Sequence, residues 1–243
     1  MSSTKKIRSK GEVKVGVIST LSPYLIPLFI KAMKESTPKM QFKIKEAYTA
    51  HLIHGLETGE IDVAIMATPT GSAHLIEHPV FQEPFLAYLN SHHPMADAAF
   101  YEMQPGDKAE LLLLQNEYCY NAQLLDICGL KNPGKIKEQF HYDINSIETL
   151  KNLVRAELGF AILPELSVIN EAHSEMFKPF KEPKPVREIS LVVSDSFSKK
   201  LLLEKMNEAI WNCLPESLRQ NFAYRKIRWN DSPYFIKAVE KFK

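Results

Sequence analysis

The 243-residue chain has only three cysteines, no long apolar run and almost no net charge. Three cysteines are too few for the disulfide scaffold of a small secreted protein. No segment approaches the roughly 20 consecutive apolar residues that a membrane-spanning helix needs. Residues 1–12 are basic but lack the apolar core of a secretory signal. We therefore expect a cytoplasmic protein without a membrane partner, in which any disulfide would be transient or sensing.

The charge balance and the motifs that are missing exclude further classes of function. The chain carries 30 basic and 29 acidic residues, which gives no support for broad nucleic-acid binding by this chain alone. It has no Ser/His/Asp signature, phosphate-binding loop or GxGxxG motif, and we do not expect an enzyme. Neighbouring histidines, such as His92 and His93, lack cysteine or carboxylate partners at metal-ligand spacing, so we expect no metal and no cofactor.

What is present is an alternation of apolar and polar residues that is typical of an α/β protein. Strand patterns cover 12–18, 41–47 and 61–66, and helical patterns cover 24–35 and 49–58. This βαβαβ order predicts a parallel, doubly wound sheet.

A second set of elements begins after residue 84, and the chain then returns to the first set. The apolar run Leu111–Leu114 predicts a buried strand, and a capping-box pair, Asn145 and Glu148, predicts the start of a helix. A short helix is expected over 165–171. The other predicted elements are strands at 85–89, 140–144, 160–163 and 188–193, and helices at 199–214 and 234–242.

These elements predict two α/β lobes. Lobe I comprises 11–83 plus 186–219, and lobe II comprises 84–185. Residues 1–10 form a basic lead and residues 220–243 a C-terminal extension. Because the chain crosses twice between the lobes, we expect a cleft there. Ligands of doubly wound folds bind at the carboxyl ends of the strands.

The segment from Glu110 to Leu130 contains Cys119 and Cys128, and the residues between them have helical spacing. Nine residues of helix (128 − 119 = 9) would separate the cysteines by about 13 Å along the axis. A disulfide needs Cα atoms within roughly 7 Å of each other. Joining the sulfurs must therefore unwind the segment, which is the physical form of a two-state redox switch. In the helix we expect Leu124, Leu125 and Ile127 to face inward, and Asn121, Gln123 and Asp126 to face outward.

The position of Cys119 suggests its chemistry. A reactive cysteine works as its thiolate, which a helix N-terminus favours; Cys119 has this position, although Glu117 opposes its ionisation. Attack on peroxide would give a sulfenic acid, which would condense with Cys128. The alternative is that both are small buried hydrophobic residues, the role that we expect for Cys213.

Thr20 and Thr49 each follow a predicted strand of lobe I, and with Cys119 they could face one cleft. Their hydroxyl groups and the nearby helix amides could bind a ligand. Each threonine could equally be the N-cap of its helix. Arg187, at the return to lobe I, is expected to be either a solvated linker charge or a ligand or hinge residue.

Several short motifs resemble the regulatory, effector-binding domain of LysR-type transcription factors. They are Leu56-x-x-Gly59-x-x-Asp62-x-Ala64-Ile65, Phe81-x-Glu83-Pro84, His93-Pro94-x-Ala96, and Ser146-x-Glu148-Thr149-Leu150 before Gly159 and Leu163-Pro164. The resemblance covers about residues 12–218. The two cysteines at this spacing resemble in particular the OxyR peroxide sensors of that family.

The resemblance implies two doubly wound lobes of the type II periplasmic-binding-protein fold, in a domain that assembles as a dimer or tetramer. It implies that Cys119 reacts with hydrogen peroxide and that Cys128 resolves the product into a disulfide, which a thiol reductant later reverses. DNA would be bound only through a winged helix-turn-helix that this chain lacks. The residues that the resemblance places at an effector site are Thr20, Thr49, Tyr118, Gln123 and Arg187.

The chain departs from the family pattern beside the reactive cysteine. Tyr118 stands where a histidine is common, and Ala122 where an aspartate is usual. Both changes remove groups that could polarise the sulfur or the peroxide. The alternative function is a LysR-type domain that binds a small metabolite between its lobes, with the cysteines incidental. A third possible function is that of a solute-binding protein with the same two-lobed fold.

Overall fold

The computed structural model describes residues 11–104, 107–115, 118–129, 142–171 and 174–241. The chain forms two compact units. Unit 1 comprises the chain up to Gln82 together with Glu188–Gln220, and unit 2 comprises Glu83–Arg187 together with Asn221–Lys241. The predicted basic lead over 1–10 lies outside the described residues.

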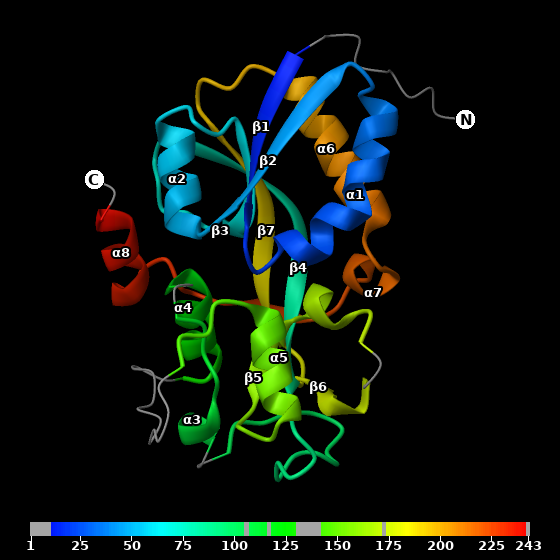
Figure 1. Ribbon diagram of the computed structural model, residues 1–243, viewed down its shortest axis with the longest axis vertical. Helices are drawn as coiled ribbons and strands as arrows, with labels where there is room; N and C mark the ends of the chain where they lie inside the picture. Colours follow the sequence, from blue (N-terminus) through cyan, green and yellow to red (C-terminus); the bar gives the residue numbers. More distant parts are fainter. Residues whose placement is uncertain (1–10, 105–106, 116–117, 130–141, 172–173, 242–243) are drawn as a thin grey trace. The chain divides into compact units, whose positions relative to one another are not determined.

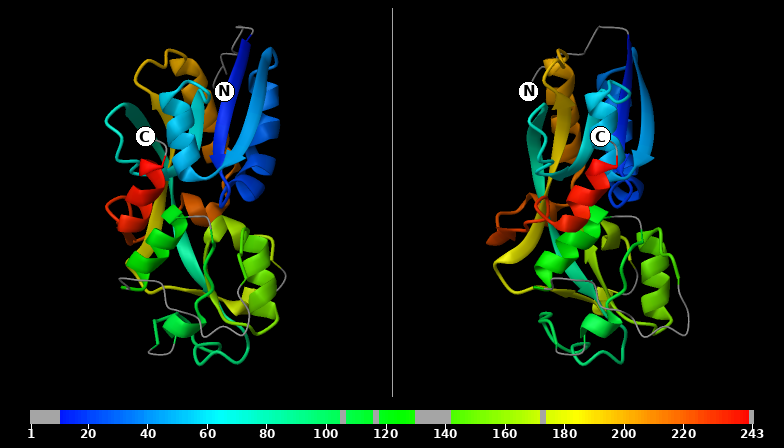
Figure 2. Two further views of the ribbon diagram at one scale, coloured as in Figure 1. Left: turned by 60° about the vertical axis from the view of Figure 1, so that its left-hand side comes forward. Right: turned by 90° about the vertical axis from the view of Figure 1, so that its left-hand side faces the viewer.

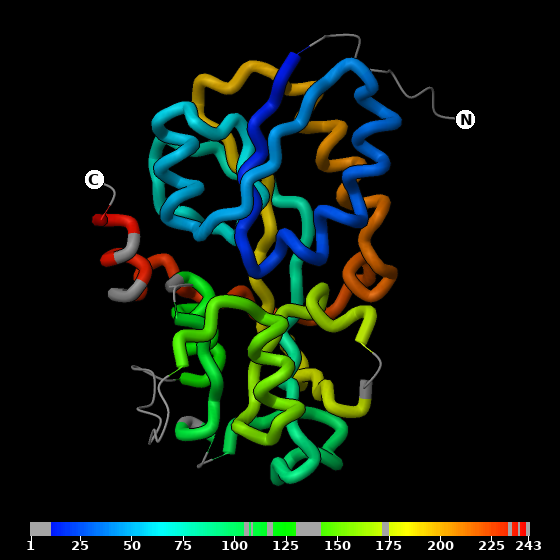
Figure 3. The backbone as a smooth tube through the Cα atoms, viewed as in Figure 1, coloured from blue at the N-terminus to red at the C-terminus, as the bar shows by residue number. Residues whose placement is uncertain are grey.

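Two long strands carry the chain between the units. β4, Leu75–Tyr88, begins in unit 1 and ends in unit 2, and β7, Lys184–Ser194, makes the return. Figure 3 traces this route from blue to red. Each unit is therefore assembled from stretches that are distant in sequence.

Unit 1 is built on a sheet whose central strands are parallel. β1, Gly11–Ile18, lies between β2, Met40–Ala47, and β3, Val63–Thr68, and pairs with both in parallel. All the residues of β3 are buried, as expected of a strand that is covered on both faces. The predicted parallel βαβαβ arrangement is confirmed. β7 adds an antiparallel strand beside β3, so the sheet is mixed rather than wholly parallel.

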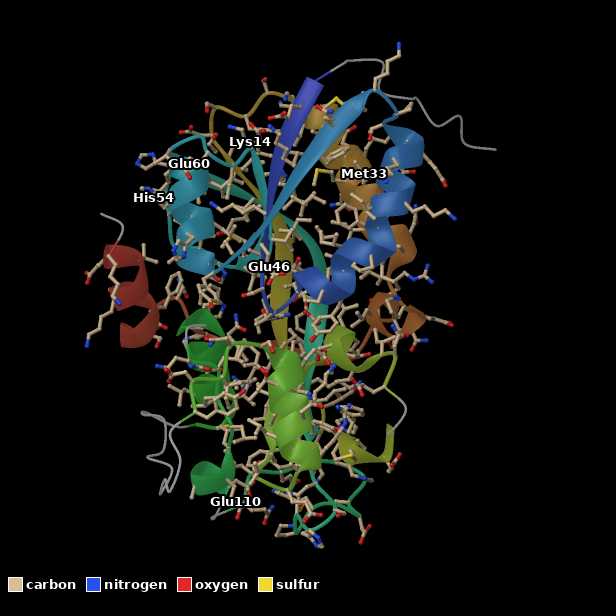
Figure 4. All side chains as sticks on the ribbon, viewed as in Figure 1. Lys14, Met33, Glu46, His54, Glu60 and Glu110 are labelled. Atoms are coloured by element: carbon tan, nitrogen blue, oxygen red, sulfur yellow. The ribbon has the colours of Figure 1, made fainter. Side chains whose placement is uncertain are left out.

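Helices cover both faces of this sheet. α1, Ser22–Ser36, packs against α6, Lys200–Cys213, on one side, while α2, Thr49–Glu57, packs against β1 and β3 on the other (Figure 1). Met33 of α1, labelled in Figure 4, is fully buried. A one-turn helix, α7 (Glu216–Arg219), follows α6. The core of unit 1 thus lies between the sheet and these helices.

Unit 2 has a small antiparallel sheet surrounded by short helices. Residues Leu86–Tyr88 of β4 pair with both β5, Ala161–Pro164, and β6, Phe177–Pro179. β8, Tyr224–Lys226, pairs in parallel with the first residues of β7. No helix in the described part of the chain is long and apolar enough to cross a membrane. The helices of unit 2 are α3 (Asp107–Glu110), α4 (Tyr118–Ile127), α5 (Ile147–Arg155) and α8 (Pro233–Glu240), with 3-10 turns η1 (Glu165–Val168) and η2 (Ser174–Met176).

The structure corrects several predictions in unit 2. Leu111–Leu114 is not a strand: Leu111 makes a single bridge to Phe160, and the run continues without a ladder. Of the strand predicted over 140–144, residues 142–144 are likewise not in a strand, and 140–141 lie outside the described residues. The helix predicted over 165–171 is only the turn η1. A short apolar run fits any buried extended segment, and periodicity alone does not reveal its hydrogen bonding.

The start of α5 also differs from the prediction by one residue. Ser146, not Asn145, is the N-cap, and its hydroxyl accepts a hydrogen bond from the Thr149 amide at 3.2 Å. Glu148 is therefore the second helical residue, and its carboxylate accepts a hydrogen bond from the buried Lys151 ammonium at 2.8 Å. The predicted helix itself is confirmed.

Candidate functional site

The helix predicted between the two cysteines is present as α4, Tyr118–Ile127. Cys119 is its second residue and is buried, whereas Cys128 follows its last residue and is half-buried. The Cys128 amide donates to the Leu124 carbonyl at 3.0 Å, and Gly129, with a φ of 62°, closes the helix in the left-handed conformation. All three cysteines of the chain lie in its described part, and all are thiols. A regular helix separates the Cα atoms of Cys119 and Cys128 by about 13 Å, too far for a disulfide.

Hydrogen bonds from two α4 side chains tie the helix to the rest of unit 2. The Tyr120 hydroxyl donates to the Ile162 carbonyl of β5 at 2.5 Å, and its ring lies against that of Phe85. The Asn121 amide group donates to the Leu114 carbonyl, just before the helix. The N-terminal turn of α4, which holds Cys119, is therefore fixed on the sheet.

The outward face predicted for α4 is wrong at Gln123. Leu124 and Leu125 are buried as expected, but Gln123 is also fully buried. Neither amide atom of its side chain has a hydrogen-bond partner within the described ranges. Ala122, beside it, is buried as well. A buried amide without partners costs about 1–3 kcal/mol, and the absence of partners among the described residues leads us to expect such a penalty in the helical form of this segment.

We expect Gln123→Met to stabilise the dithiol form by about 1–2 kcal/mol, because methionine fills a similar volume without burying a polar group. The measurement is the free energy of unfolding of the reduced protein in a denaturant titration. Gln123→Asn, which keeps an amide but shortens the side chain, is the control and should destabilise. A Gln123→Met protein that is no more stable than the original would contradict this account of the buried amide.

Cys128 lies within electrostatic reach of a buried polar cluster that the sequence analysis did not identify. Its centre is the Asp107 carboxylate, which accepts hydrogen bonds from the Tyr101 hydroxyl at 2.5 Å and the Gln104 amide at 2.7 Å. The Nε2 atom of buried His93 lies 3.3 Å from the same carboxylate. Burial raises the pKa of the Cys128 thiol to about 12, and the charge of Asp107 adds to the rise. In the helical form Cys128 is thus a protonated thiol at neutral pH.

The two predicted effector threonines belong to unit 1. β1 and β2 pair in parallel up to Ile18 and Ala47, and Thr20 and Thr49 follow these ends at the same edge of the sheet, both buried. The N-caps of α1 and α2 are Leu21 and Tyr48, so the capping role considered for the threonines is wrong.

A further hydroxyl lies at this edge. Ser19, next to Thr20, has a buried Oγ atom without a hydrogen-bond partner in the described part of the chain. The edge therefore gathers hydroxyl groups at the carboxyl ends of parallel strands, where doubly wound folds bind ligands. Thr20 and Thr49 lie in unit 1 and Cys119 lies in unit 2, and their convergence on one cleft stays a prediction.

Arg187 is a buried residue, so the alternative of a solvated linker charge is wrong. Its Nε atom donates to the Glu83 carboxylate at 2.8 Å, and its guanidinium lies over the Phe85 ring. Glu83 is fully buried and also accepts a hydrogen bond from the Leu166 amide at 3.0 Å. Burial raises the pKa of Glu83, and the charge of Arg187 opposes the rise. The pair ties β4, β7 and η1 together within unit 2.

Unit 2 also contains a cavity of about 620 Å³, away from these residues. Its lining includes Asn90, Arg155, Glu157, Glu175 and Lys178, and none of the predicted site residues. Among the described residues no group of three or more His, Cys, Asp or Glu side chains could hold a metal ion.

Comparison with known proteins gives one consistent result. The LysR substrate binding domain family matches residues 7–208. A hydrogen peroxide-inducible genes activator of Haemophilus influenzae is 36% identical over 79% of this chain, and the DNA-binding transcriptional dual regulator OxyR of Escherichia coli is 31% identical over 86%. The chain spans 64% of the length of the former protein and 68% of the latter.

Solved structures agree with the sequence relatives. OxyR from Porphyromonas gingivalis has a TM-score of 0.80 at 25% identity, with 90% of this chain and 100% of that chain covered. The reduced OxyR regulatory domain of Pseudomonas aeruginosa has a TM-score of 0.72 at 29% identity, with 84% and 98% covered. The mixed α/β fold of the type II periplasmic-binding-protein type is thus confirmed. Because the family match spans most of its length, the chain belongs to the LysR substrate binding domain family, and the relatives it resembles are OxyR proteins.

Proposed function

We propose that this chain is the peroxide-sensing regulatory domain of an OxyR-like transcription regulator. The observation that carries the proposal is the placement of two thiols at opposite ends of α4, Cys119 in its first turn and Cys128 just after its last residue. A helix N-terminus favours the thiolate of Cys119. The disulfide requires α4 to unwind, because its geometry is incompatible with a regular helix of this length.

The proposed chemistry has two steps. The Cys119 thiolate attacks one oxygen of hydrogen peroxide, the O–O bond breaks, and hydroxide leaves and takes up a proton to become water, so that Cys119 becomes a sulfenic acid. The Cys128 sulfur then attacks the sulfenic sulfur, the S–O bond breaks and a second water leaves. The pair has lost two electrons to the peroxide. A thiol reductant returns the pair to the dithiol state.

The wider role rests on the relatives. Curated relatives are named for activation of genes by hydrogen peroxide and for DNA binding. In this proposal the domain acts in the cytoplasm, assembles as a dimer or tetramer, and affects DNA only through a winged helix-turn-helix outside this chain. It consumes one peroxide per reduction and is not an enzyme. Thr20, Thr49, Tyr118, Gln123 and Arg187 remain proposed effector-site residues.

Mass spectrometry of the protein after treatment with one equivalent of hydrogen peroxide tests the proposal. We expect the reduced protein to lose two hydrogens and to yield a linked Cys119–Cys128 peptide pair, because the sulfenic acid condenses with the second thiol. Cys119→Ser should abolish the link completely.

Cys213→Ser is the matched control, since Cys213 lies in unit 1 on α6, and it should react as the original does. Cys128→Ser should stop at the sulfenic acid, which a dimedone adduct would report. A protein that stays fully reduced, or a Cys119→Ser variant that responds equally, would refute the sensor function.

A further inference from the structure

The last residues that the structure describes, which lie after the family match, have a defined place in unit 2. The match ends at residue 208, and the segment Asn221–Lys241, which we name the C-terminal strap, belongs to unit 2 although the residues just before it belong to unit 1. In both views of Figure 2 its red helix, α8, lies beside the green helix α4. The strap therefore contacts the element that carries the two cysteines.

The strap is anchored in unit 2 by its own strand and by a buried tryptophan. β8 pairs with residues 184–186 of β7, and the Ile227 amide donates to the Val186 carbonyl at 3.1 Å. Trp229 is fully buried, and its ring meets that of Phe235 edge-on, with the centroids 4.7 Å apart. An anchored segment can exert a restraint on its neighbour, whereas a loose tail cannot.

Two contacts join the strap to α4. α8 packs along the helix, and the Arg225 Nη1 atom lies 2.7 Å from the Asp126 carboxylate in the last turn of α4. Asp126 is two residues before Cys128. Disulfide formation has to displace one end of α4, since a regular helix holds the cysteines too far apart. We expect the last turn to move, because the bonds of Tyr120 and Asn121 hold the first turn in place. The same displacement separates Asp126 from Arg225.

We propose that the C-terminal strap holds α4 in its helical, dithiol form, and that Arg225 is a positioning residue that opposes formation of the Cys119–Cys128 disulfide. The inference rests on the proposed function and adds a control element to it. Contacts made in the dithiol form and lost in the disulfide form shift the redox equilibrium toward the thiols. The strap thereby sets the oxidant level at which the domain switches.

The equilibrium with glutathione measures this effect. Protein dithiol and one glutathione disulfide exchange to give protein disulfide and two reduced glutathiones, so atoms and electrons balance. Half-exposed ion pairs of this kind change equilibria modestly. Arg225→Gln and Asp126→Asn should each raise the equilibrium constant for oxidation by about two- to fivefold. The equilibrium constant of the double variant should be no higher than that of either single variant, because the two substitutions remove the same interaction.

Arg228→Gln is the matched control. Arg228 is an exposed arginine of the same strap, and its replacement should leave the equilibrium constant unchanged. Thermal unfolding of each reduced variant separates this effect from general destabilisation. The inference is overturned if Arg225→Gln gives the original equilibrium constant, or if Arg228→Gln shifts it equally. If neither the original protein nor any variant forms the Cys119–Cys128 link with glutathione disulfide or peroxide, the proposed function itself is wrong.

Discussion

Arg187→Met is expected to destabilise the protein by about 3–5 kcal/mol at neutral pH. The substitution removes the cation beside a fully buried carboxylate, since Arg187 donates to Glu83 inside unit 2. Glu83 would retain its bond from the Leu166 amide, but an uncompensated buried charge would remain. Denaturant unfolding, with the midpoint and slope both recorded, measures the loss.

The loss of stability caused by Arg187→Met should become smaller at low pH. Burial already raises the pKa of Glu83 above its ordinary 4.5, and Arg187 opposes that rise, so removing Arg187 raises it further. A carboxyl group whose pKa is raised on folding favours the folded state below its unfolded pKa, and this contribution disappears as the pH rises through the folded pKa. The penalty of Arg187→Met should therefore shrink as the pH falls toward 4.5.

The double variant Glu83→Gln/Arg187→Met is the control for this prediction. It removes both charges while a glutamine oxygen can still accept from the Leu166 amide, so it should recover much of the lost stability. A double variant less stable than Arg187→Met would show that the pair contributes through packing rather than charge.

Cys128 is expected to react with iodoacetamide about a thousandfold more slowly at pH 8 than an ordinary thiol. The thiolate is the reactive form, and burial with the nearby Asp107 charge raises the pKa of Cys128 from 9.0 to about 12. A difference of three pH units in pKa changes the thiolate fraction by about a thousandfold. The Cys119→Ser/Cys213→Ser variant isolates this thiol, and its alkylation rate is followed by mass spectrometry.

The same variant unfolded in urea is the reference and should react at the ordinary rate. Folding stability should also fall between pH 9 and 12, because a thiol whose pKa is raised on folding favours the folded state only while protonated. Fast alkylation of the folded variant at pH 8 would contradict the burial of Cys128. In the proposed mechanism, the low thiolate fraction of Cys128 in the helix means that unwinding of α4 precedes attack on the sulfenic acid.

Local patterns in the sequence predicted the strands and helices whose apolar residues recur with a regular period. The alternation around Val13, Val15 and Val17 gave the strand β1, and the apolar run after Ile61 gave the buried strand β3. The strand predicted at Leu111–Leu114 is absent, because Leu111, Leu112 and Leu114 are buried without a partner strand along their length. An apolar run indicates that a segment is buried, but it does not indicate how the backbone of that segment is hydrogen-bonded.

The candidate site was predictable where it is local and not where it depends on distant contacts. The helix between Cys119 and Cys128 follows from spacing over one segment. The buried position of Gln123 does not, because α4 is covered on more than one side and its apolar periodicity is weak. No sequence pattern marked Asp107 as a site residue. Its influence on the site arises from its proximity to His93 and Cys128, which are remote from it in sequence.

The interleaving of the two units constrains how the chain is made. Unit 1 needs Glu188–Gln220 and unit 2 needs Asn221–Lys241, so neither unit is complete until its last segment has left the ribosome. Folding of multidomain proteins usually proceeds from the N-terminal domain during synthesis, but here Glu83–Arg187 of unit 2 leaves the ribosome before unit 1 has received Glu188–Gln220. Trp229 is a fully buried residue of the segment Asn221–Lys241. Its apolar site in unit 2 therefore stays open to solvent, and to chaperones, until Asn221–Lys241 has been synthesised.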